Sequence, residues 1–93
     1  MTETPAGRRP RQLAGVREYP MGIELLLYPP GGDKAHALNP TARLVWELCD
    51  GTRTALQISE ELAPDVGRPA TELLPDVNTA IRQFEEQGLL ESQ

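Results

Sequence analysis

The fold is decided in residues 38–54, LNPTARLVWELCDGTRT, where the alternating pattern of the preceding chain gives way to a helical one. Asn39 is a favoured N-cap residue, and Pro40 suits the first position of a helix, where no N–H donor is needed. Apolar side chains then recur at helical spacing as far as Gly51, a residue type that commonly follows a helix end. The pattern predicts a helix over residues 40–50 that is buried on more than half of its circumference.

Two further helices are predicted downstream. Thr54, with Gln57 three residues later, forms a capping-box pattern, so we expect a second helix that Pro64 ends. The last helix is expected to run to the residue before Gly88. Its start is open, because Pro75 can either begin the helix or kink it.

The chain upstream of residue 39 is predicted to form a sheet. Short apolar runs at residues 16–19 and 23–28 are bounded by Pro- and Gly-rich turns. A third, short strand at residues 34–38 is inferred mainly because two strands alone are marginally stable. Three strands followed by three helices indicate an α+β domain.

Length and charge set limits on organisation and partners. The 93 residues suffice for one domain, and we expect a disordered basic arm at residues 1–15 followed by the folded domain at residues 16–91. The arm holds three Arg against one Glu, a net charge of +2. Since the whole chain has a net charge of −5, residues 16–93 carry a net charge of −7. An acidic domain repels phosphate backbones, which disfavours nucleic acid as a partner. No apolar run is long enough to span a membrane or to form a signal peptide, and the expected location is the cytoplasm.

The residues that usually carry chemistry are sparse. Cys49 and His36 are the only cysteine and histidine, so no internal disulfide and no Cys- or His-rich metal site can form. The carboxylate pairs at residues 60–61 and 85–86 are sequence neighbours, which do not face each other on a helix. We therefore expect a binding module without a cofactor or metal, and not an enzyme.

The third strand has the properties of a binding edge. At the edge of a sheet, unpaired N–H and C=O groups can receive an extended peptide as an added strand. The stretch at residues 34–38 has small side chains, and Lys34 is its only charge.

Residues 38–54 also resemble the PqqD family (pyrroloquinoline quinone biosynthesis protein D). The similarity continues through Ile58 and Leu62 to residues 76–77, Phe84 and residues 88–91. The resemblance implies a winged-helix-like arrangement that binds the leader of a ribosomally made precursor peptide by strand addition. It further implies that the domain presents the peptide to a tailoring enzyme, often a radical S-adenosylmethionine (SAM) enzyme, and is not itself a catalyst.

The resemblance also implies where the peptide binds. It assigns the receiving strand to residues 34–38 and the groove to a flank of the last helix, which has two candidate flanks. The flank that carries Leu73, Asp76, Ala80 and Gln83 is the alternative. We favour the other flank, so the expected peptide-binding residues are Lys34, Ala35, His36, Ala37, Leu38, Leu74, Asn78, Ile81, Arg82 and Glu85.

Two other functions stay open at this stage. The second and last helices resemble a helix-turn-helix, which would suit a winged-helix transcription regulator, although the last helix carries mostly acidic side chains. A small subunit that binds an enzyme but no peptide is the other alternative. The expected oligomeric state is a monomer or a strand-swapped dimer.

Overall fold

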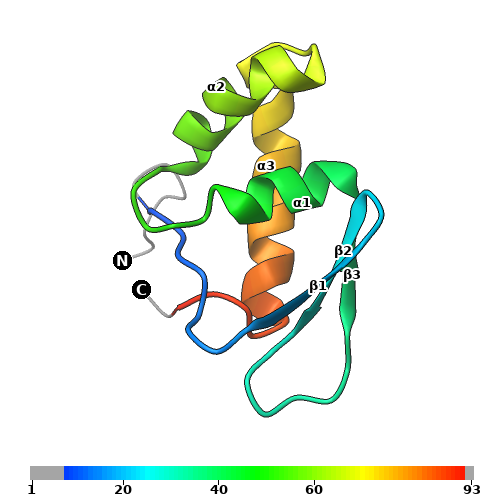
Figure 1. Ribbon diagram of the computed structural model, residues 1–93. Helices are drawn as coiled ribbons and strands as arrows, with labels where there is room; N and C mark the ends of the chain where they lie inside the picture. The colour runs from blue at the N-terminus through cyan, green and yellow to red at the C-terminus, as the bar shows by residue number, and fades with distance from the viewer. Residues whose placement is uncertain (1–7, 92–93) are drawn as a thin grey trace.

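The computed structural model describes residues 8–91, which form an antiparallel sheet and three helices (Figure 1). This arrangement confirms the predicted α+β fold. The elements, in chain order, are β1 (Arg17–Met21), β2 (Glu24–Tyr28), β3 (His36–Leu38), α1 (Pro40–Glu47), α2 (Ala55–Val66) and α3 (Ala70–Glu86).

The sheet has the order β1-β2-β3, so β2 is its central strand. Leu25 and Leu27 of β2 are buried in the core, whereas the alternate residue Leu26 lies on the opposite face, as the two-residue period of a strand requires. Pro20 lies within β1 and not in the predicted turn. A proline is tolerated there because β1 is an edge strand, where not every N–H is needed for pairing. The reversal to β2 instead uses Gly22, whose φ is +65°.

Trp46 and Phe84 anchor the core between α1 and α3. Their rings meet edge to face, with centroids 5.5 Å apart, and Trp46 is 0% exposed. The buried indole N–H donates a hydrogen bond to Glu18 Oε2 at 3.1 Å, which ties β1 to α1. A buried indole donor needs such a partner, so Glu18 fixes how the sheet sits against the helices.

The predicted helix starts are confirmed for α1 and α2. Ala42 N–H donates to Asn39 Oδ1 at 2.8 Å, which makes Asn39 the N-cap of α1. Thr54 and Gln57 form both bonds of the capping box at α2, at 2.8 and 3.2 Å.

Two predicted helix ends are wrong. The first helix ends at Glu47 and not at residue 50, because the chain leaves the helix to pair with residues near the N-terminus. α2 continues through Pro64 to Val66. The missing N–H of Pro64 removes one bond near the end of the helix, and Gly67, at φ +76°, then forms the left-handed cap.

The last helix starts before its proline, so Pro75 does not begin it. α3 begins at Ala70, and Pro75 lies inside it. At the other end, Gly88 has φ +73°, and Leu89 N–H donates to the Phe84 carbonyl at 2.9 Å. This pattern is a Schellman motif, and it turns Leu89 into the core.

Residues 8–13, called here the N-terminal segment, pack against the folded domain. Gln12 N–H donates to the Cys49 carbonyl, and Leu13 N–H donates to the Leu89 carbonyl, each at 2.9 Å. The segment therefore lies between the end of α1 and the C-terminal residues (Figure 1). Isolated antiparallel bridges pair Arg11 with Asp50 and Gln12 with Leu90.

These contacts correct the prediction of a disordered arm over residues 1–15. For residues 8–15 the prediction fails, because backbone hydrogen bonds and the burial of Pro10 hold the chain in place. Residues 1–7 lie outside the described part of the chain.

Candidate functional site

β3 forms one of the two edges of the sheet, and β1 forms the other. Ala37 pairs with Leu26 of β2 and is exposed, and within residues 8–91 no strand pairs with the other side of β3. The strand spans only His36–Leu38, so Lys34 and Ala35 of the predicted strand lie in the preceding loop. The last pair of this ladder is Leu27 with His36, and β2 itself ends at Tyr28, before Pro29, which has no N–H to extend a ladder. Leu38 faces the core and is buried.

A groove of about 380 Å³ begins at the residue that follows β3. We call it the α1–α3 groove, because the start of α1 forms one wall and α3 forms the other. Val45 and Ala80 are its buried members and form the floor. The complete lining consists of Asn39, Thr41, Ala42, Val45, Arg68, Asp76, Thr79, Ala80 and Gln83.

The structure brings the alternative flank of α3 to this groove, and not the flank that we favoured. Asn78 and Ile81 line a separate cavity of about 20 Å³ together with Arg8 and Pro10 of the N-terminal segment. Glu85 forms an ion pair with Arg8, Arg82 is exposed, and Leu74 packs partly buried against the core. The N-terminal segment, which the sequence predicts to be disordered, therefore covers much of the favoured flank.

The groove residues that the favoured set omitted are Asp76, Ala80 and Gln83 from the other flank, and Thr79 beside them. Asp76, Ala80 and Gln83 belong to the flank that the sequence analysis gives as the alternative peptide-binding flank. The helical period separates the two flanks of α3, but it does not say which flank a neighbouring segment covers.

An ion-pair ladder borders the groove. The Arg68 guanidinium contacts Asp76 Oδ2 at 3.1 Å and Glu72 Oε1 at 3.8 Å, and its Nη2 donates to the Glu72 carbonyl at 3.3 Å. The two acids lie one turn apart on α3, so a single guanidinium serves both. The other groove residues are uncharged.

A second hollow, of about 530 Å³, lies on the outer face of the sheet. Tyr19 and Tyr28 meet edge to face there, with ring centroids 5.5 Å apart, and the Arg17 guanidinium lies 4.9 Å from the Tyr28 ring centroid. Tyr19 is 46% exposed and Met21 is 59% exposed. This face is open and apolar, and the groups that line it do not form an acid–base or nucleophile–base pair.

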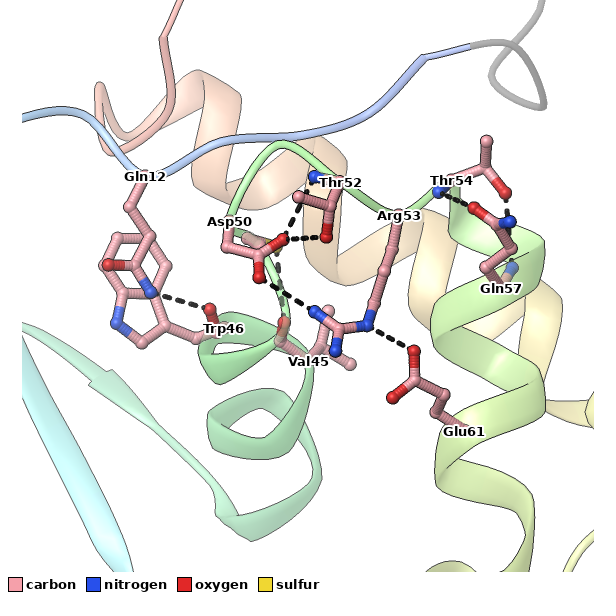
Figure 2. Close-up of polar contacts among 10 residues, drawn as sticks. Gln12, Val45, Trp46, Asp50, Thr52, Arg53, Thr54, Gln57 and Glu61 are labelled. Atoms are coloured by element: carbon pink, nitrogen blue, oxygen red, sulfur yellow. Dashed lines mark hydrogen bonds and ion pairs between the residues drawn. The ribbon is translucent and has the colours of Figure 1, made fainter.

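A polar network joins the linker between α1 and α2 to α2 itself (Figure 2). Arg53 bridges Asp50, at 2.9 Å, and Glu61 on α2. Hydrogen bonds from Thr52 to Asp50, with a contribution from the nearby Arg53 charge, lower the pKa of that carboxyl. Glu61 in turn raises the pKa of Arg53. All of these contacts stabilise the charged forms, so the network holds the linker in place.

Cys49 lies at the end of α1 as a buried thiol. Burial, with a smaller contribution from Asp50, raises the pKa of the thiol to about 12. Its Sγ donates to the Val45 carbonyl at 3.2 Å. The thiolate, which is the reactive form, is therefore disfavoured at neutral pH.

Residues 8–91 hold neither a cluster of metal ligands nor a membrane-spanning helix. No group of three or more His, Cys, Asp or Glu side chains there could hold a metal ion. No helix there has the length and apolarity needed to cross a membrane.

The described chain is thus a small α+β domain in which one edge strand of the sheet, β3, lies beside a groove between helices. The model of the family described as Coenzyme PQQ synthesis protein D (PqqD) matches residues 24–90, from β2 to the C-terminal bridge. The match covers well over half of the sequence, and the chain belongs to the PqqD family. No curated protein and no solved structure gives a significant match.

Members of this family are non-catalytic chaperones that bind precursor peptides in pyrroloquinoline quinone biosynthesis, and they partner with a radical SAM enzyme.

Proposed function

We propose that this chain binds the leader of a ribosomally synthesised precursor peptide as a fourth strand on β3 and presents it to a tailoring enzyme, a radical SAM protein, in the cytoplasm. The observation that carries the proposal is the free edge of β3, which leads directly into the α1–α3 groove in a member of a precursor-binding family. The chain supplies the docking site, and the enzyme supplies the chemistry.

Because β3 is short, strand pairing can supply only part of the binding free energy of a leader peptide. Each backbone hydrogen bond contributes a net of about 0.5–1.5 kcal/mol, and β3 has only three residues to offer. Micromolar binding needs about 8 kcal/mol, which so few bonds do not supply. Burying one aliphatic side chain adds about 1.5–3 kcal/mol. A leader that pairs with β3 must therefore continue into the α1–α3 groove and bury apolar side chains there.

The other two functions have less support. A DNA-binding role conflicts with the net charge of −5, because an acidic protein repels the phosphate backbone. A subunit that binds an enzyme but no peptide would give no reason for the free strand edge beside the groove.

The test is a fluorescence-anisotropy titration of the labelled leader half of the neighbouring precursor peptide with the full chain. The core half of the same precursor serves as the matched control peptide. Saturable binding of the leader half alone supports the proposal. Absence of leader binding, together with co-purification with the tailoring enzyme, would favour the enzyme-subunit function instead.

Two proline variants locate the site. Along an antiparallel strand the N–H groups point alternately to the two sides, so of His36 and Ala37 one donates toward β2 and the other toward the free edge. One of the variants His36→Pro and Ala37→Pro should therefore lower the free energy of unfolding. The other should keep that free energy and weaken leader binding about tenfold or more. If both folded variants bind the leader as the parent does, the peptide does not add to β3.

A further inference from the structure

The α1–α3 groove has the size of a site for a short peptide segment. Its volume of about 380 Å³ is near the lower end of the range of about 300–1,000 Å³ found for ligand sites. The floor is made of Val45 and Ala80, and Ala42 lies beside it; all three side chains are small and apolar. A floor of this kind leaves depth for an aliphatic side chain of an incoming strand.

The charges at the border of the groove are unequal. Within the lining, the charges of Arg68 and Asp76 cancel; Glu72, which contacts Arg68 from outside the lining, brings the local sum to −1. The Asp76 side chain is 57% exposed, so it is open to a further partner from solvent. The remaining lining side chains are uncharged, so they do not offset this excess.

Arg68 is less available than the acids. Its Nε, Nη1 and Nη2 atoms already face Glu72 and Asp76. An incoming carboxylate would have to compete with these contacts. An incoming ammonium or guanidinium would instead meet two carboxylates, Glu72 and Asp76, that share the single Arg68 guanidinium. The total charge of −5 adds a longer-range attraction for cationic peptides.

We propose, on the basis of the leader-binding function above, that the α1–α3 groove selects leaders in which an aliphatic residue lies next to a Lys or Arg. The aliphatic side chain packs on Val45 and Ala80, and the cation pairs with Asp76. Asp76 is thus a specificity-determining residue for the leader and takes no part in the chemistry of modification.

The test selects short random peptides displayed on phage against the full chain. The expected consensus combines an aliphatic residue with Lys or Arg. One selected peptide is then synthesised with its cation and with Glu in that position. Exposed ion pairs are weak, so we expect the Glu peptide to bind about three- to tenfold more weakly, and the difference to shrink as salt is raised.

Three variants assign the preference to the groove. Asp76→Lys should abolish or reverse the preference for the cationic peptide. Thr79→Lys adds a positive charge to the same groove without breaking the Arg68 ion pair, so it gives a second reading if Asp76→Lys folds poorly. Glu60→Lys makes the same charge change as Asp76→Lys at an exposed position of α2 that does not line the groove, and it should leave the preference unchanged.

The outcomes separate this inference from the proposed function. Peptides that bind saturably but without a charge preference, with an acidic consensus, or with a preference that both groove variants leave intact, overturn the charge selection and leave the chaperone function standing. If neither the displayed peptides nor the natural leader bind, both proposals fail.

Discussion

The hydrogen bond from Trp46 to Glu18 gives a sharp test of how the sheet is fixed to the helices. Trp46 is fully buried, and its indole N–H donates to Glu18 Oε2 at 3.1 Å. The variant Glu18→Ala removes the acceptor and leaves that donor without its partner. A buried unsatisfied donor costs about 1–3 kcal/mol. Glu18 itself is exposed, so water can partly replace the carboxylate, and we expect a loss of about 1–2 kcal/mol.

A loss of this size is a measurable part of the free energy of unfolding. A chain of 93 residues has a free energy of unfolding of roughly 5–14 kcal/mol. At about 4–8 °C per kcal/mol, the Tm should fall by about 4–16 °C. Glu18→Gln keeps an acceptor oxygen but loses the charge. Since charge-assisted bonds are about twice as strong as neutral ones, this variant should recover about half of the loss.

The assay is urea unfolding followed by the fluorescence of Trp46, the single tryptophan of the chain. Glu24→Ala is the matched control, because it removes an exposed carboxylate from the neighbouring strand β2 and should change stability by less than about 0.5 kcal/mol. If Glu18→Ala unfolds at the same urea concentration as Glu24→Ala with an equal slope, the bond does not stabilise the fold and the reasoning is refuted.

Three further predictions concern pH and backbone conformation. The folded chain holds the Cys49 proton up to a pKa of about 12, whereas the unfolded thiol releases it near 9.0, so stability should fall by about 1.4 kcal/mol per pH unit between these values. Urea titrations on both sides of pH 9.0 should show this fall in stability in the parent and not in Cys49→Ala. The pKa of Asp50 is lowered from 3.8 by hydrogen bonds from Thr52, so its contribution is present above that value and is lost as the pH falls through the lower folded pKa. Asp50→Asn should therefore unfold with a smaller dependence on pH in acid, and an unchanged acid profile would contradict this. Gly88→Ala should lower stability by about 1 kcal/mol in a thermal melt, because φ is +73° while no atom within 4 Å would clash with the new Cβ. A melt like that of the parent would mean that the Schellman turn is not under this constraint.

The sequence predicts best where local chemistry decides the structure. Asn39 and the Thr54–Gln57 pair could be assigned as caps because their side chains bond backbone groups only three residues away. The N-terminal segment could not be found in this way. It is held by backbone hydrogen bonds to Cys49 and Leu89, and such bonds leave no periodic pattern of side chains.

The candidate site shows the same division. The free strand edge could be predicted in outline, because strand order and turn residues mark it. Which flank of α3 lines the α1–α3 groove could not be predicted, because both flanks carry mixed polar and apolar residues. Which flank is covered depends on Arg8 and Pro10, which contact Asn78, Ile81 and Glu85 from a distant part of the chain.

The pairing of the two ends of the described chain has a practical consequence. Glu91 N–H donates to the Arg11 carbonyl at 2.9 Å, and β3 lies on the opposite side of the molecule in Figure 1. A tether fused beyond either end would therefore leave the sheet edge unobstructed. The domain can be joined through a flexible linker to a chosen enzyme in either order, and the linker length then sets the local concentration of captured peptide at that enzyme.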